Sequence, residues 1–457
     1  MNKVHIETLG CKVNQYESSA IMDNLLKRGF EKAESLEVAD IFILNSCTVT
    51  NRTDFKSRNM IRRFLDLKEQ NPEKIIIITG CYVQREKEQA EDLGDIDALV
   101  DNNSKNIIPE LIENLIKNRS IETELITPFH SISEFKDFTE LPSETMNDKS
   151  RAFIKIQDGC HFYCAYCAVP FARGNPRSRR PESIIEQIKK MIGSGYREFV
   201  LAGINQGLYG IDFEEKNPIA NNLAELIQAI CDIPEYKKIR LSSVEPQLFT
   251  EELIEVICKN DQVCPHLHIP LQSGSDTLLK AMRRRYDTHF FKTLIEKLIH
   301  RRPDIAFGFD VIVGLPGETD ALFDETYRFL KEMPLTYLHT FIYSKRNGTD
   351  AAKMPNQVHG KTAKERSQKL ISLSSEKTAQ YIQTLINQQT SLFCVAETED
   401  KGYFHGTSDH YVKCHFKSDQ IKVNQGDLVI IKPLNASHNE VYADINEIFY
   451  HLKKDNS

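Results

Sequence analysis

The stretch Asp158–Cys167 reads DGCHFYCAYC and carries three cysteines in a C-x₃-C-x₂-C spacing. Three thiolates on one short loop can hold three irons of a cubane iron–sulfur cluster and leave the fourth iron open to another ligand. The stretch follows an apolar, strand-like run at 152–157, so the loop is expected at the carboxyl end of a strand. Cys160, Cys164 and Cys167 are therefore the first candidate cluster ligands.

A zinc site is the alternative reading of this loop, with His161 as a fourth ligand. Structural zinc usually takes ligand pairs from two separate loops. Cys160 and His161 are adjacent and would be an awkward pair, so the spacing favours the cluster.

The region around this loop, residues 146–376, alternates strand and helix patterns. Apolar runs begin near six residues: Ala152, Glu198, Lys238, His266, Ala306 and Tyr337. Amphipathic stretches such as 181–192 and 222–231 lie between them. Six βα units of this size predict a partial (β/α)₆ barrel, and chemistry in such barrels gathers at the carboxyl ends of the strands.

The first 117 residues show the same alternation and predict an open, parallel βαβ sheet. Each of three apolar runs ends at a cysteine: Cys11, Cys47 and Cys81. Parallel strands would bring these thiols to one sheet edge, the usual ligand crevice of an open α/β fold. Three separately buried structural thiols are the alternative. Small or polar flanking residues (Gly10, Ser46, Gly80) favour a second cluster.

The remaining segments have other characters. Residues 118–145 are polar and are interpreted as a linker. Residues 377–450 begin with a helical lead-in and continue as short β-type runs separated by turns, such as 424–427. This pattern predicts a small all-β, OB-like barrel. The predicted fold class is thus α/β with a small all-β domain at the end.

Composition limits the classes of protein. The chain has 457 residues, 40% hydrophobic, with a net charge of −7 and eleven cysteines. It has no apolar run of 18 residues and no signal-like start, so we expect a cytoplasmic protein without membrane contact. In a reducing compartment, an odd number of cysteines indicates metal or catalysis rather than disulfides.

Two local basic runs are candidate RNA contacts in this acidic chain. One comprises Arg173, Arg177, Arg179 and Arg180, with no acidic residue from 168 to 181. The other lies within 51–63, where Arg52, Lys56 and Arg63 share a helical face. Both follow cluster loops, so contact with phosphates is a reasonable hypothesis. A solvated surface is the alternative for each run.

The end of the chain is less suited to phosphate. Residues 387–450 hold five lysines and no arginine against nine acidic residues. Four aromatic residues there could stack on bases or form barrel core, and core is the favoured reading: Tyr403, Phe404, Tyr411 and Phe416.

The cysteine loop at the start of a six-unit partial barrel resembles the radical S-adenosylmethionine (SAM) superfamily. The segments at 8–17, 45–50, 79–81, 169–174 and 310–319 resemble the methylthiotransferases within it, and the last domain is placed like their RNA-binding TRAM domain. The run GCKVNQYE at 10–17 is most similar to the branch acting on N6-threonylcarbamoyladenosine at position 37 of tRNA. Sister branches act on isopentenyladenosine in tRNA or on an aspartate of a ribosomal protein.

The resemblance implies two [4Fe–4S] clusters, one per cysteine trio, and SAM at the strand ends. The implied SAM contacts are Tyr166, Gly203, Asn205, Ser243, Glu245 and Gln272. One SAM would donate a methyl group to sulfur at the N-terminal cluster, and a second would yield the radical that removes hydrogen from C2 of the adenine. Expected partners are tRNA and an electron donor such as flavodoxin or ferredoxin, with no DNA. The alternative that is not an enzyme is a zinc-stabilised RNA-binding protein.

Overall fold

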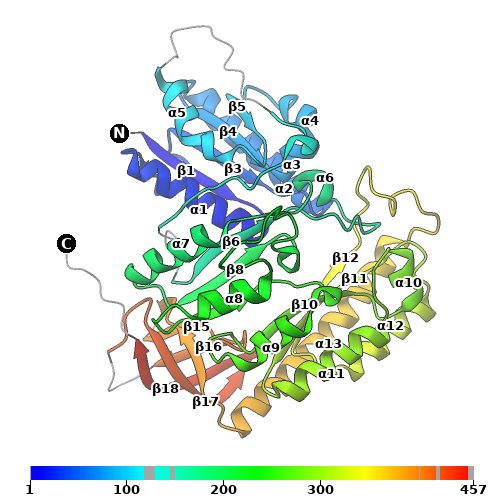
Figure 1. Cartoon of the computed structure of the whole chain (residues 1–457). Coiled ribbons are helices and arrows are strands. Elements are labelled where there is room, and N and C mark those ends of the chain that lie inside the picture. The colour runs from blue at the N-terminus through cyan, green and yellow to red at the C-terminus, as the bar shows by residue number, and fades with distance from the viewer. Residues whose placement is uncertain (1, 118–128, 145–149, 401, 418–421, 451–457) are drawn as a thin grey trace.

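The computed structural model describes residues 2–117, 129–144, 150–400, 402–417 and 422–450 (Figure 1). The N-terminal domain, blue in Figure 1, is a parallel five-stranded sheet in the order β2-β1-β3-β4-β5. Its strands are β1 (Lys3–Thr8), β2 (Glu31–Lys32), β3 (Ile41–Ser46), β4 (Ile75–Gly80) and β5 (Ala98–Val100). Every residue of β3 and β4 is buried, because helices cover both faces of a parallel sheet. The open parallel sheet predicted for this region is confirmed.

The helices of this domain follow the strands in alternation. The first, α1 (Lys12–Lys27), starts directly after Cys11. Thr50 caps the next, α2 (Asn51–Gln70), in a capping box with Thr53, which fixes where this helix begins. The others are α3 (Cys81–Arg85), α4 (Lys87–Glu91), η1 (Lys105–Ile107) and α5 (Ile108–Lys117).

The central domain is the predicted partial barrel, and its strands begin at the six predicted residues. They are β6 (Ala152–Asp158), β8 (Glu198–Gly203), β9 (Lys238–Leu241), β10 (His266–Gln272), β11 (Ala306–Val313) and β12 (Tyr337–Ile342). The parallel sheets β6-β8-β9 and β10-β11-β12 join where Ile239 exchanges backbone hydrogen bonds with Gln262 and Cys264, both at 2.8 Å. The short β7 (Arg177–Ser178) pairs antiparallel with β6.

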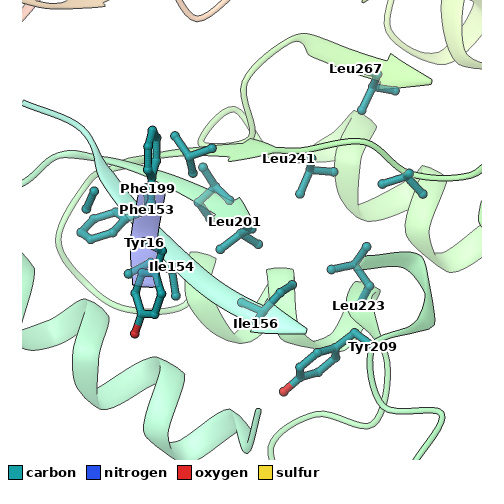
Figure 2. Close-up of a cluster of buried hydrophobic side chains, with 14 of the residues drawn as sticks. Tyr16, Phe153, Ile154, Ile156, Phe199, Leu201, Tyr209, Leu223, Leu241 and Leu267 are labelled. Carbon is teal, nitrogen blue, oxygen red and sulfur yellow. The ribbon is translucent and has the colours of Figure 1, made fainter. Parts of the chain in front are cut away.

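Helices cover the outside of this barrel. They are α7 (Pro181–Gly193), α8 (Leu223–Cys231), α9 (Glu251–Lys259), α10 (Asp276–Ala281), α11 (Thr288–Arg301) and α12 (Asp320–Glu332). The short α6 (Pro170–Arg173) lies instead against α3 of the N-terminal domain. Figure 2 shows the apolar core between β6, β8, β9 and their helices, with Phe153, Leu201 and Leu223 among its members. Tyr16 of α1 enters the same core, and its hydroxyl donates to the Leu141 carbonyl at 2.8 Å. The first two domains therefore share buried surface.

One long helix connects the barrel to the last domain. It is α13 (Gly360–Asn387). Leu370 and Leu373 pack into the central core, whereas Ile382 and Leu385 pack into the core of the C-terminal domain. The boundary predicted at 376/377 thus falls in the middle of a helix that both domains share.

The C-terminal domain is a curled six-stranded sheet in the order β13-β17-β18-β16-β15-β14, orange to red in Figure 1. Its strands are β13 (Leu392–Val395), β14 (Thr398–Asp400), β15 (Tyr403–Thr407), β16 (Lys413–Lys417), β17 (Leu428–Ser437) and β18 (Glu440–Tyr450). A bridge between Cys394 and Ser408 brings β13 beside the end of β15. Phe416 is fully buried in its core, which confirms the core reading for that aromatic residue.

A loop of this domain enters the base of the central barrel. Arg240 of β9 donates to the carbonyls of Ser408 (2.8 Å) and Asp409 (3.1 Å). Asp409 also pairs with Lys238 at 3.2 Å. Tyr411 stacks on His266 with ring centroids 4.4 Å apart. Tyr411 therefore fills the barrel base and is neither C-terminal core nor open for base stacking.

In the described part of the predicted linker, 129–144, half of the residues are exposed and a few apolar side chains pack against the neighbouring domains. Phe135 and Leu141 are buried, and the Arg177 guanidinium lies 5.3 Å from the Phe135 ring. Residues 118–128 and 145 of that prediction lie outside the described residues. No helix in the described ranges is long and apolar enough to cross a bilayer.

Candidate active site

The N-terminal cysteines lie together at the carboxyl edge of the first sheet. Cys11 follows β1, Cys47 follows β3, and Cys81 follows β4. Glycines make this approach possible, since a Cβ on Gly10 would lie 3.0 Å from the Cys47 sulfur. A Cβ on Gly80 would lie 2.3 Å from the Ser46 carbonyl oxygen, and Gly80 has φ +100°. Only glycine fits there without moving the backbone.

Polar side chains hold this trio in place. The Asn14 amide donates to the carbonyls of Leu9 (2.8 Å) and Ser46 (3.0 Å), tying α1 to the ends of β1 and β3. The Cys81 sulfur accepts from Asn102 Nδ2 at 3.7 Å and Arg173 Nε at 3.3 Å. Burial raises the pKa of Cys47 to about 12. A thiolate at this position therefore needs a compensating cation such as bound iron.

The second trio occupies the loop after β6. Gly159 opens this loop at φ +76°, where a Cβ would lie 1.9 Å from the Asn175 carbonyl oxygen. The backbone N–H of Cys160 donates to the Gly174 carbonyl (2.9 Å), and the backbone N–H of Cys167 donates to the Cys164 carbonyl (2.9 Å). Burial raises the pKa of Cys167 to about 12.

Both trios border the same cavity. It has a volume of about 240 Å³ and touches Cys81 from the first sheet and Cys167 from the barrel. Its lining is mostly apolar, and it includes Thr48–Thr50, Tyr166, Ala168, Val169, Ala172, Gln272, Asp310, Ile312 and Phe341–Ser344. Carboxyl ends of both sheets therefore enclose one space between the two cysteine sites.

Neither cysteine trio has the close spacing of the ligands of a single zinc ion. A zinc ion with ligands at about 2.3 Å would bring thiolate sulfurs to about 3.8 Å from one another. Over the described ranges, the one group of His, Cys, Asp and Glu whose ligand atoms all lie within 4.8 Å of one another is His268, Asp310 and His339. The sulfur atoms of neither cysteine trio all lie within 4.8 Å of one another.

Comparison with known proteins decides the family. Residues 3–101 match the family described as Uncharacterized protein family UPF0004, and residues 154–330 match the Radical SAM superfamily. The chain is 39% identical over 441 residues to a threonylcarbamoyladenosine tRNA methylthiotransferase (MtaB) of Bacillus subtilis, covering 96% of this chain and 95% of the relative. This chain belongs to the radical SAM methylthiotransferase family.

Two further similarities agree with this family. A tRNA-2-methylthio-N6-dimethylallyladenosine synthase of Thermoanaerobacter pseudethanolicus is 35% identical to this chain, and the alignment covers 82% of this chain and 79% of that relative. A solved radical SAM methyltransferase, TsrM of Kitasatospora setae, matches at a TM-score of 0.56 and 14% identity over 77% and 74% of the two chains, which indicates a shared fold. As a member of the radical SAM family, this chain is expected to use a [4Fe–4S] cluster and SAM.

Within this methylthiotransferase, the predicted SAM contacts gather near the central trio. Asn205 Nδ2 lies 3.6 Å from the Cys160 sulfur, and Tyr166 and Gln272 line the cavity. Gly203 ends β8, where a Cβ would lie 3.2 Å from Gln157 Oε1, and the Ser243 carbonyl accepts from Gln206 at 3.3 Å. Among the described residues, Asn205 Oδ1 and Gln206 Oε1 are buried without a hydrogen-bond donor.

Sequence reasoning missed the partner of Glu245. Both oxygens of this carboxylate contact the Arg284 guanidinium, one of them at 3.2 Å. Arg284 is buried and also donates to the Cys164 sulfur at 3.2 Å. In the sequence Arg284 is only the middle residue of a basic run at 283–285, which does not indicate a buried partner.

Three of the four arginines in the 173–180 run that was predicted to contact RNA are buried, which corrects that part of the prediction. Arg173 is 0% exposed and contacts Glu17 Oε1 (2.7 Å) and Asp158 Oδ2 (3.0 Å). Arg177 and Arg179 are each 2% exposed; Arg177 donates to the Arg173 carbonyl, and Arg179 pairs with Glu140 at 2.8 Å. Clustered arginines look alike in sequence whether they face water or buried carboxylates.

The other predicted RNA contacts remain at the surface. Arg180 is exposed, with its guanidinium 5.1 Å from the Phe213 ring. Arg52, Lys56 and Arg63 are exposed on α2, whose first turn follows the cavity-lining Thr48–Thr50. Phe55 is 55% exposed between Arg52 and Lys56 in sequence.

A buried arginine that the sequence did not indicate, Arg346, holds the start of α2 beside the cavity. Arg346, which follows β12, contacts Asp54 (2.7 Å), Thr48 (2.6 Å) and Asn51 (2.7 Å). These contacts fix the N-terminal domain against the last barrel strand.

Proposed function

We propose that this chain adds a methylthio group to C2 of N6-threonylcarbamoyladenosine at position 37 of tRNA. The observation that carries the proposal is the single cavity bordered by Cys81 of one trio and Cys167 of the other. A reaction that installs sulfur by radical chemistry needs both sites beside one substrate atom. The name of the Bacillus subtilis relative supports the choice of nucleoside.

In this proposal, Cys160, Cys164 and Cys167 hold one [4Fe–4S] cluster, and Cys11, Cys47 and Cys81 hold a second. When bound, the first supplies the electron that cleaves SAM to a radical, and the second supplies the position from which sulfur is transferred. A flavodoxin or ferredoxin is the proposed source of the electron.

The chain's own residues bind, orient and exclude water. Asn205 Oδ1 and Gln206 Oε1, buried without donors among the described residues, are suited to accept hydrogen bonds from SAM. Arg284 orients the Glu245 carboxylate beside the same loop and opposes the rise in the Glu245 pKa that burial causes. Val49, Val169 and Ile312 give the cavity an apolar wall that limits side reactions of a radical.

Substrate RNA would reach the cavity over the start of α2. Arg52 and Lys56 offer charge for phosphates, and Phe55 offers a ring for a base. Contact of the acidic C-terminal barrel with RNA would then depend on shape or on a few local groups rather than on net charge.

Mass spectrometry of tRNA nucleosides tests this function. A strain lacking the gene should lose the 2-methylthio form of threonylcarbamoyladenosine and keep the unmethylthiolated nucleoside. Wild-type protein should restore it, and a Cys160→Ala variant should not. Loss of a methylthiolated isopentenyladenosine instead, or an unchanged nucleoside profile, would refute the proposal.

A further inference from the structure

Three polar side chains lie side by side on the inner face of the last barrel strands. They are His268 of β10, Asp310 of β11 and His339 of β12. His268 Nε2 and His339 Nδ1 lie 2.8 and 3.4 Å from Asp310 Oδ1. Asp310 lines the cavity between the two cysteine trios. The three side chains, called the floor below, therefore meet the mostly apolar cavity at Asp310.

This floor has unused hydrogen-bonding capacity. The His339 side chain is 47% exposed although it faces the barrel interior, and Phe341 on the same face is 43% exposed. Asp310 Oδ1 is buried beside the two imidazoles, which hold the pKa of Asp310 below its usual range. An interior face that is polar and open to solvent is suited to a ligand.

The layer beneath holds the floor in place. The Tyr337 hydroxyl contacts His268 Nδ1 (3.0 Å) and His266 Nε2 (2.9 Å), which turns the other nitrogen of His268 toward Asp310. Gly308 makes room, since a Cβ there would lie 2.1 Å from the Tyr337 ring. Tyr411 stacks on His266 from the C-terminal loop. The floor is thus preorganised rather than loose.

A cation from the N-terminal domain reaches the same space. Lys12, the residue after Cys11, is partly buried, and its ammonium lies 6.0 Å from the Tyr411 ring. Because Tyr411 belongs to the layer beneath the floor, the Lys12 ammonium lies beside that layer and one residue away from a proposed cluster ligand.

We infer that His268, Asp310, His339 and Lys12 form a subsite for the polar N6 substituent of the substrate adenine. This inference rests on the proposed function and deepens it. A threonylcarbamoyl group carries a carboxylate, which suits Lys12 and the imidazole N–H groups. It also carries N–H and hydroxyl donors, which suit Asp310 Oδ1. A prenyl group has no such atoms. It would remove water from the imidazoles and the carboxylate of the floor without giving them hydrogen-bond partners, so the subsite selects against a prenyl substituent.

The test compares binding of three anticodon stem-loop RNAs to the anaerobically reconstituted holoenzyme by fluorescence anisotropy. The RNAs carry N6-threonylcarbamoyladenosine, N6-isopentenyladenosine or plain adenosine at the target position. We expect wild-type protein to prefer the first by about tenfold or more, as the loss of a buried hydrogen bond to a charged group implies. His339→Phe keeps the ring but loses the nitrogens, and should lower affinity for the first RNA about tenfold without changing the third.

Thr340→Val is the matched control, because Thr340 neighbours His339 on β12 and alternation points it to the opposite face. It should bind all three RNAs as wild type does. Lys12→Met, checked for full iron content and an unchanged cluster spectrum, should reproduce the selective loss.

Two results would overturn the inference. One is an undiminished preference for threonylcarbamoyl RNA in His339→Phe. The other is a divalent ion bound stoichiometrically by wild type and lost in His339→Phe while RNA preference stays the same, since two imidazoles and a carboxylate also suit a metal. If wild-type protein makes the methylthiolated product in both cases, the proposed function stands and the subsite alone fails.

Discussion

Gly80 shows how one residue determines a site. A Cβ at this position would lie 2.3 Å from the Ser46 carbonyl oxygen, and φ is +100°. We predict that Gly80→Ala displaces Cys81 and removes the N-terminal cluster but keeps the barrel cluster, seen as loss of about half the iron and labile sulfide.

Gly29→Ala is the control for this change. Gly29 also has a positive φ of +86°, but nothing lies within 4 Å of the added Cβ. It should cost about 1 kcal/mol of stability and leave the iron content unchanged. Equal iron loss in both variants would mean that backbone strain, rather than the close approach to Ser46, explains the effect.

Arg284 is the second residue-scale case, since its guanidinium donates to the Cys164 sulfur at 3.2 Å. Hydrogen bonds and positive charge near cluster sulfurs raise the reduction potential. Arg284→Gln should lower that of the barrel cluster by roughly 60 mV, the one-electron equivalent of ~1.4 kcal/mol. An EPR-monitored redox titration measures this, with Arg283→Gln as control because Arg283 is exposed and pairs with Asp350. Equal potentials in the two variants would contradict the assigned contact.

At the scale of elements, a buried charge network joins α1 to β6 and α6. The Glu17 carboxylate contacts Arg173 (2.7 Å), Lys155 (2.8 Å) and Lys105. Burial alone would raise the pKa of Glu17, but these cations hold it well below its usual range. The network therefore stabilises the contact between the first two domains only while Glu17 is charged.

Glu17→Gln should destabilise the protein by about 3–5 kcal/mol, because it leaves buried cations without their anion. The folded-state pKa is lowered, so this contribution is complete above the unfolded pKa of about 4.3 and disappears only as pH falls through the folded value. The difference from wild type in urea unfolding should thus be constant from pH 6 to 8. A neighbouring exposed change, Glu34→Gln, should have little effect. A difference in unfolding free energy between wild type and Glu17→Gln that varies between pH 6 and 8 would contradict the network.

The elements also show what the sequence could predict. Apolar runs predicted all six barrel strand starts, because five of these strands are buried along almost their whole length and leave a nearly uninterrupted signal. Three cysteines were selected because each ends an apolar run, and the other three because of their spacing on the loop after such a run; their role as cluster ligands stays a prediction. Arg173, Arg284 and Arg346 were misread or missed, because a buried pair forms between segments distant in sequence. The Ser408–Tyr411 loop in the barrel base was invisible for the same reason.

At the scale of the whole molecule, a net charge of −7 means that RNA binding must depend on local cations. Arg52 and Lys56 lie in the first turns of α2, next to the cavity-lining Thr48–Thr50. The double variant Arg52→Ala and Lys56→Ala should weaken the binding of all tRNA sequences to a similar degree. It should also reduce the magnitude of the slope of log K against log salt concentration by about 1–2. Lys259→Ala on the outer helix α9 should do neither. An unchanged salt slope in the double variant would place the RNA elsewhere.

We propose two clusters, one on each cysteine trio, beside one cavity. The iron and sulfide content of anaerobically reconstituted protein, together with Mössbauer spectra, is the sharpest test of this arrangement. We expect about eight irons per chain in wild type, about four in Cys81→Ala, and about four in Cys160→Ala, with different residual spectra in the two variants. A wild-type content of about four irons that Cys81→Ala leaves unchanged would contradict it.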